Sequence, residues 1–165
     1  MKKWTLVAIV LVVAAVVLVS GMGLFPSNSN GAKNKTATMT IDFYGASAVH
    51  FRNNITTWSN ASGTWTYESH ASENGTTLFV FKNMSFSSNV MDLLMECSKV
   101  GDFPIVRQAY VGMGTIIQSI DGVENQDPRG WQYYVNGTYA LVAVDKTVLS
   151  GGEVIDWKFI TLQGN

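Results

Sequence analysis

Two histidines and five carboxylates are the side chains of this sequence that could carry acid–base chemistry. A general acid–base pair, or a nucleophile with its activating histidine, needs groups that the fold brings within hydrogen-bond reach. The order and spacing of these residues assign no such pair, so we predict that the protein is not an enzyme. The residues concerned are His50, His70, Glu68, Glu73, Asp121, Glu124 and Asp127.

Metal binding is the second chemistry that these residue types suggest. A protein metal site normally needs three or four ligands. His50 and His70 lie far apart, with no cysteine cluster and no regular carboxylate spacing beside them. We therefore predict no metal site and interpret both histidines as solvated surface residues. The single cysteine, Cys97, excludes an intramolecular disulfide and is interpreted as a buried hydrophobic residue; a reactive thiol is the alternative.

Aromatic residues in the stretch Gly130–Phe159 could fill a core or form the wall of a small-ligand site. Strand-like alternation places Trp131 and Tyr133 on one face and Tyr134 on the other. We interpret Trp131, Tyr133 and Trp157 mainly as core residues. The candidate ligand-binding residues are Tyr134 and Tyr139, which are the better surface candidates, together with Trp131 and Tyr133.

The composition limits the size of the fold and the kinds of partner. The chain has 165 residues, 14% of them charged, and a formal net charge of -1. Nucleic-acid binding relies on clustered Lys and Arg that neutralise phosphates, and this sequence has no such cluster. We predict one globular domain after an N-terminal segment, and no nucleic-acid partner.

An apolar run near the N-terminus predicts membrane targeting. Leu6–Val19 is unbroken apolar sequence. As a helix, residues 4–25 would extend roughly 33 Å, enough for a hydrocarbon core of about 30 Å. We predict that residues 1–25 form an uncleaved anchor that puts the C-terminal domain outside the cell membrane, because Lys2 and Lys3 precede the run. Secretion after cleavage of a signal peptide near Gly21-Met22-Gly23 is the alternative.

The sequence after this run supports an extracellular location. Residues 26–36 are polar and predict a flexible stalk. Asn-x-Ser/Thr sequons, the acceptor sites for N-glycosylation, occur along the chain, and we expect glycans on at least some of them. Their asparagines are Asn34, Asn54, Asn60, Asn74, Asn83 and Asn136.

The first half of the domain has one clear pattern. Ala37–Phe43 alternates apolar and polar residues and predicts a strand with one wet side. The stretch 45–87 is weakly patterned and is interpreted as an insertion. Within it, Thr64–Tyr67 and Thr77–Lys82 resemble strands, and Asn74-Gly75 is a candidate hairpin turn.

The second half predicts a helix followed by strands. Ser88–Val100 has helical apolar periodicity, with Asn89 and Asp92 at its start and Gly101 as a left-handed C-cap. Two strands follow, Ile105–Val111 and Thr115–Ile120, and then a turn at Asp121-Gly122. The focal stretch predicts paired strands with tight turns at Asn136-Gly137, of type I′, and at Gly151-Gly152, with a return strand over Tyr139–Val144.

Three segments together resemble a known family. They are Ile120-Asp121-Gly122, the run Trp131, Tyr133, Tyr134, Val135, Asn136 and Gly137, and the ending Leu149, Gly152, Glu153, Ile155 and Trp157. In order and spacing they are similar to an extracellular domain-of-unknown-function family related to the C-terminal β-domain of transcobalamin and intrinsic factor. The resemblance implies a β-rich α+β domain over residues 37–163, with mostly antiparallel sheets and one packed helix, akin to β-grasp-like folds.

Two functions follow as expectations. The first is a membrane-tethered, non-enzymatic module of the cell surface that has a structural role or binds another protein, with no cofactor. The alternative, which the resemblance implies, is the binding of a small cyclic ligand such as cobalamin or another tetrapyrrole. In transcobalamin-type proteins the β-domain covers one face of cobalamin, and a helical domain supplies the rest of the site.

Overall fold

The computed structural model describes residues 35–162, which lie within the compact unit Lys33–Asn165. The predicted anchor over residues 1–25, most of the predicted stalk and the Asn34 sequon lie outside the described residues. Within the described range, no helix is both long enough and apolar enough to span a bilayer.

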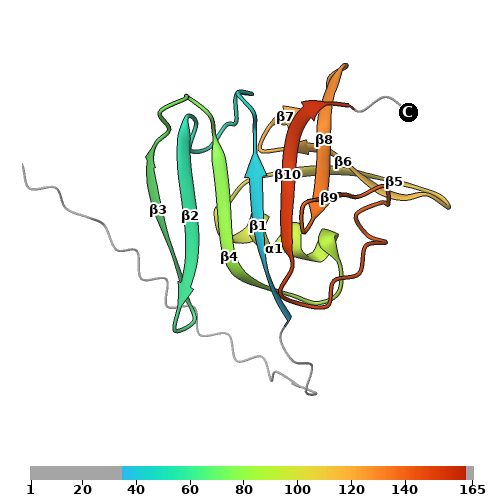
Figure 1. Ribbon diagram of the computed structural model, residues 1–165, viewed down its shortest axis with the longest axis horizontal. Coiled ribbons are helices and arrows are strands. Elements are labelled where there is room, and N and C mark those ends of the chain that lie inside the picture. Colours follow the sequence, from blue (N-terminus) through green and yellow to red (C-terminus); the bar gives the residue numbers. More distant parts are fainter. Residues whose placement is uncertain (1–34, 163–165) are drawn as a thin grey trace, which may run out of the picture. The chain divides into compact units, whose positions relative to one another are not determined.

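A seven-stranded mixed sheet forms the larger layer of the domain (Figure 1). Its spatial order is β3-β2-β4-β1-β10-β8-β9. The pairs β1–β10 and β2–β4 are parallel, and the other neighbouring strands are antiparallel. The strands are β1 (Lys35–Asp42), β2 (Asn54–Ala61), β3 (Thr64–Ala71), β4 (Leu78–Phe86), β8 (Arg129–Val135), β9 (Thr138–Tyr139) and β10 (Val154–Thr161).

One helix and a small sheet lie on the same face of this layer, behind it in Figure 1. The helix is α1 (Val90–Gly101), and the three-stranded sheet contains β5 (Ile105–Tyr110), β6 (Gly114–Ile120) and β7 (Val123–Glu124). The architecture is thus β-rich α+β with one helix in the described range, as predicted.

The core lies between the large sheet and these covering elements. Ala37, Met39 and Ile41 on β1 are buried, which confirms the predicted alternation, and the aromatic chains of β4 and β10 extend the same surface. Cys97 on α1 is fully buried, and burial raises the pKa of its thiol well above the usual range. The thiol is therefore held in its unreactive protonated form, and the interpretation of Cys97 as a hydrophobic residue is supported.

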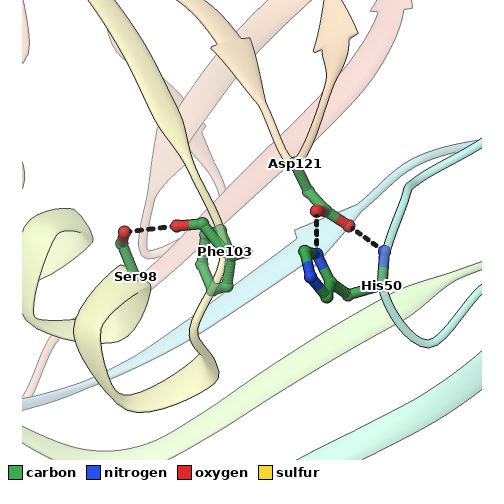
Figure 2. Close-up of polar contacts among 4 residues, drawn as sticks. All are labelled: His50, Ser98, Phe103 and Asp121. Atoms are coloured by element: carbon green, nitrogen blue, oxygen red, sulfur yellow. Dashed lines mark hydrogen bonds and ion pairs between the residues drawn. The ribbon is translucent and has the colours of Figure 1, made fainter.

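The start of α1 is as predicted, but its end is not. Asn89 accepts a hydrogen bond from the Asp92 N–H, and Asp92 reciprocates in a capping box. The prediction of Gly101 as the left-handed C-cap was wrong, because Asp102 takes that conformation with φ 53°. Gly101 serves packing instead, since a Cβ there would lie 2.7 Å from the Phe103 ring. The Ser98 hydroxyl donates to the Phe103 carbonyl and helps to close this end (Figure 2).

The stretch 45–87 contributes β2, β3 and β4 to the large sheet. The interpretation of this stretch as an insertion was therefore wrong, and β2 was not predicted. The predicted hairpin turn at Asn74-Gly75 was also wrong, because β3 and β4 are not neighbours: β2 lies between them. The hairpin joins β2 to β3 at Ser62-Gly63, whose φ angles of 54° and 87° suit a two-residue turn with both central residues left-handed.

The focal stretch Gly130–Phe159 forms part of one edge of the large sheet. Its turn at Asn136-Gly137 has φ angles of 49° and 79°, as predicted for type I′. The predicted return strand over Tyr139–Val144 was wrong beyond Tyr139, because the chain there leaves the sheet and packs on β6. After the Gly151-Gly152 turn, β10 runs between β1 and β8.

Candidate functional site

A small cavity lies between β6, β8, β10 and the irregular segment after β9. We call it the β6–β8 groove. Its volume is about 110 Å³. It is lined by Thr115, Ile116, Ile117, Trp131, Gln132, Tyr133, Tyr139, Ala140, Val142, Ala143, Val144 and Trp157.

Aromatic side chains of the core form the inner wall of the groove. The Trp131 indole donates to the Val123 carbonyl at 2.8 Å, which locks its orientation. The Tyr133 ring lies 5.1 Å from the Trp157 ring, and its hydroxyl lies 2.6 Å from both the Val142 carbonyl and the Thr147 hydroxyl. Burial raises the pKa of Tyr133, so its phenol stays neutral. The inner wall is therefore rigid and uncharged.

One buried donor in this wall has no acceptor. Within residues 35–162, Trp157 Nε1 makes no hydrogen bond although Trp157 is only 2% exposed. Gln132 Oε1 is also without a partner in that range. Alternation along β8 puts the Gln132 side chain on the opposite face from those of Trp131 and Tyr133, although Gln132 and Trp157 both border the groove.

The segment 140–148 closes the groove by docking on β6. Asp145 accepts a hydrogen bond from the Thr115 N–H at 2.7 Å, and the Val144 N–H donates to the Thr115 carbonyl at 3.3 Å. The Thr115 N–H lowers the pKa of the Asp145 carboxyl. Gly114 permits this close approach, because a Cβ there would lie 2.6 Å from the Ala143 Cβ.

Exposed apolar side chains line the groove or lie on chain segments next to it, and Ile116 and Val142 are the two that line it. They come from the β5–β6 hairpin tip, from β6 and from the docked segment, which the Thr115 and Gly114 contacts bring together. We call this set the apolar rim. Its members and their exposed fractions are Val111 105%, Met113 69%, Ile116 47%, Leu141 83% and Val142 54%.

The predicted ligand-binding residues divide between two faces. Trp131 and Tyr133 are buried in the core, at 8% and 5% exposure, and line the groove. Tyr134 and Tyr139 are half-buried and pack on each other with ring centroids 5.5 Å apart. The Lys158 ammonium lies 4.4 Å from the Tyr134 ring centroid. Tyr139 borders the groove, whereas Tyr134 is not one of its lining residues.

The histidines are not equivalent. His70 is exposed on β3, as predicted. His50, with 42% of its side chain exposed, places Nδ1 2.5 Å from Oδ1 of the fully buried Asp121 (Figure 2). The His50 N–H also donates to Asp121 Oδ2 at 2.8 Å. The interpretation of His50 as simply solvated therefore missed a partner. The sequence marked Asp121 only as part of an Asp-Gly turn. No pattern in the sequence connected Asp121 with His50.

This pair is not accompanied by further catalytic or metal-binding groups in the described range. Among residues 35–162, no serine hydroxyl is hydrogen-bonded to His50, and the nearby Ser47 hydroxyl accepts a hydrogen bond from Arg52 instead. No group of three or more His, Cys, Asp or Glu side chains is arranged to hold a metal ion among residues 35–162. The four remaining predicted carboxylates are all exposed, namely Glu68, Glu73, Glu124 and Asp127.

A larger and more open cleft of about 620 Å³ lies beside the β7–β8 connection. Its one cationic lining residue, Arg129, is already engaged: the guanidinium donates to the Tyr44 and Phe159 carbonyls and lies 4.5 Å from the Phe159 ring centroid. The cleft therefore offers no unengaged guanidinium to an anionic ligand.

These features define a β-rich α+β domain with a narrow aromatic groove under an apolar rim. The chain matches the family model described as a domain of unknown function, DUF4430, over residues 88–161, from just before α1 into β10. This supports the predicted resemblance to a domain-of-unknown-function family, but the match omits β1 to β4. No curated protein matches the chain.

Two solved structures are similar to this chain at low identity. One is a protein of Ruminococcus gnavus ATCC 29149 whose description proposes metal binding: 12% identity, TM-score 0.37, covering 67% of this chain and 98% of that one. The other is haptocorrin in complex with Cbi: 14% identity, TM-score 0.43, covering 80% of this chain and 27% of haptocorrin. At these TM-scores neither similarity carries an argument about function.

Proposed function

We propose that this chain is a membrane-tethered, non-enzymatic module of the cell surface that binds another protein through the apolar rim and the β6–β8 groove. The observation that carries the proposal is the rim itself. Five large apolar side chains, each 47% or more exposed, lie in or next to the segments that border one cavity, and two of them, Ile116 and Val142, line it. Clustered exposed apolar surface is typical of interaction sites, whereas scattered single residues are not.

The size of the groove favours a side chain of a partner over a free ligand. Sites for small molecules and cofactors usually have volumes of about 300–1,000 Å³. The groove, at about 110 Å³, is smaller. Protein interfaces commonly place an apolar or aromatic anchor from one partner in a well-packed pocket of the other. The rigid wall of Trp131, Tyr133 and Trp157 would receive such an anchor without reorganisation.

The proposed location rests on the N-terminal sequence. Residues 4–25 are long enough and apolar enough to cross a bilayer, and Lys2 and Lys3 favour an external domain. Nine residues, 26–34, link this segment to β1. A partner of the domain would therefore be sought on the outer side of the membrane.

A small cyclic ligand remains the second candidate, because three of the four predicted ligand-binding residues, Trp131, Tyr133 and Tyr139, border the groove. A tetrapyrrole would require the segment 140–148 to move away from β6. Titration of the full-length protein with cobalamin, followed by tryptophan fluorescence, tests this candidate. A saturable change would favour ligand binding, and an unchanged spectrum would exclude cobalamin.

Site-specific photocrosslinking in intact cells tests the principal proposal. A photoreactive residue at Ile116, in the rim, should capture one defined protein. The same residue at Val106, which is 53% exposed on β5 and outside the rim, is the matched control. Equal capture at both positions, or none at either, would contradict binding through the rim.

A further inference from the structure

We propose that Asn60 carries an N-linked glycan whose first sugar packs on the indole of Trp65. This inference rests on the proposed location outside the cell and is independent of the partner that the rim binds. It goes beyond the presence of a sequon, because it assigns the glycan a contact surface and a stabilising role.

Asn60 and Trp65 are direct neighbours across the β2–β3 hairpin. The register pairs Asn60 with Trp65, and the next pair on the same face is Trp58 with Tyr67. Paired residues of an antiparallel ladder point to the same face, with Cβ atoms about 5 Å apart. A group attached to the Asn60 side chain therefore starts beside the Trp65 indole.

The tight turn of this hairpin sets the orientation of the Asn60 amide. Its Oδ1 accepts a hydrogen bond from the Gly63 N–H at 2.8 Å. This hydrogen bond engages Asn60 Oδ1 and not Nδ2. Nδ2 is the atom to which an N-linked glycan is attached. Asn60 is exposed, and Ser62 completes its sequon inside the turn.

An open cleft of about 360 Å³ lies beside this pair. Trp65 is half-buried and lines the cleft, so one part of this large aromatic side chain is not covered by protein. Glu96 and Val100 of α1 also line the cleft. The C–H face of a sugar ring can lie on an aromatic ring, and its hydroxyls would face the polar side of the cleft.

Two other sequons help to test the assignment. Asn83 lines the same cleft from a bulge in β4, with φ 54°, so a glycan there would compete for the same aromatic surface. Asn74 is exposed in the β3–β4 connection and is not among the cleft residues. Asn74 is therefore the matched control for a glycan without an aromatic contact.

Glycopeptide mass spectrometry of the full-length protein from its own membranes is the first measurement. We expect occupancy at Asn60. If other sequons are occupied and Asn60 is not, the inference is overturned while the proposed location stands. If no sequon is occupied, the inference is overturned, and the sequons no longer support the proposed location, which then rests on the N-terminal sequence alone.

Thermal unfolding of variants is the second measurement. Ser62→Ala removes the sequon but keeps Asn60 and its bond to Gly63, and it should lower Tm by about 3 °C in the Trp65 protein. In a Trp65→Ala background the same substitution should change Tm by less than about 1 °C. Asn74→Gln, which removes the Asn74 sequon, should have no comparable effect with Trp65 present.

The same variants made in a host without N-glycosylation correct for the effects of the substitutions themselves. There the Ser62→Ala effect should be equal with and without Trp65. An equal Ser62→Ala effect in both backgrounds of the glycosylated protein would overturn the contact between the glycan and Trp65. The Ser62→Ala effect should persist in an Asn83→Gln background, and its loss there would show that it depends on Asn83 and would overturn the inference.

Discussion

The Nδ1 atom of His50 lies 2.5 Å from Oδ1 of Asp121, and this contact joins the β1–β2 loop to the β6–β7 turn. Asp121 also accepts the His50 N–H through Oδ2, and its own carbonyl accepts the Val49 N–H at 3.2 Å. The carboxylate is fully buried. One side chain thus ties a loop of the large sheet to the small sheet.

Replacing Asp121 with alanine should therefore destabilise the domain. The substitution removes two hydrogen bonds to a buried carboxylate and leaves the His50 N–H without its partner, so we expect a loss of about 2–4 kcal/mol in the free energy of unfolding. Urea unfolding followed by fluorescence measures it. His70→Ala, at an exposed histidine, should change the free energy by less than about 0.5 kcal/mol. Equal effects of the two substitutions would refute the structural role of Asp121.

Docking of the segment 140–148 on β6 should depend on pH through Asp145. Because the pKa of Asp145 is lowered in the folded protein, its contribution to stability is present above the unfolded value, near 3.8, and is lost as the pH falls through the folded value. Asp145→Asn should lower stability at neutral pH, and its difference from the wild type should shrink below about pH 4. Urea midpoints measured between about pH 3 and 7 test this, and a difference that stays constant would contradict it.

The C-terminal end of α1 should respond in opposite directions to two neighbouring substitutions. Gly101→Ala places a Cβ against the Phe103 ring and should lower stability by about 1–2 kcal/mol despite the better helix propensity of alanine. Asp102→Gly relieves a left-handed conformation and removes an acid from a helix C-terminus, so it should raise stability by about 1 kcal/mol. If thermal unfolding shows that Gly101→Ala raises stability and Asp102→Gly lowers it, this account of the helix end is contradicted.

The rigidity of the groove wall should depend on the Tyr133 hydroxyl. Tyr133→Phe removes its contacts with the Val142 carbonyl and the Thr147 hydroxyl, and should cost about 1–2 kcal/mol. Amide hydrogen exchange should speed up in the segment 140–148 and stay unchanged in α1. The control is Tyr67→Phe, at a side chain that is 57% exposed. Unchanged exchange in the segment would show that the hydroxyl does not hold it.

Local patterns in the sequence were sufficient for elements in which one face is buried and the turn chemistry is strict. The alternation of β1, the Asn89 cap and the Asn136-Gly137 turn were all predicted, and each depends on residues close together in sequence. The strand β2 was missed because its buried positions include the polar Thr56 beside Trp58, which hides the apolar alternation. The hairpin at Ser62-Gly63 was missed because serine rarely takes φ near 54°.

The candidate site was only partly predictable for a related reason. Trp131 and Tyr133 were identified because they lie in one alternating strand. The apolar rim, in contrast, combines Val111 and Met113 with Leu141 and Val142, and the contacts of Gly114 and Thr115 that bring them together are tertiary. His50 and Asp121 are 71 residues apart, so no spacing rule could join them.

The affinity of the full-length protein for the partner captured at Ile116 tests the central claim most directly. Leu141→Asp puts a charge into the apolar rim and should weaken this affinity at least about tenfold, equivalent to about 1.4 kcal/mol, with no change in the unfolding midpoint. Val106→Asp, outside the rim, should leave the affinity within about twofold. Equal affinities for the wild type and Leu141→Asp would contradict the proposal that the rim binds the partner.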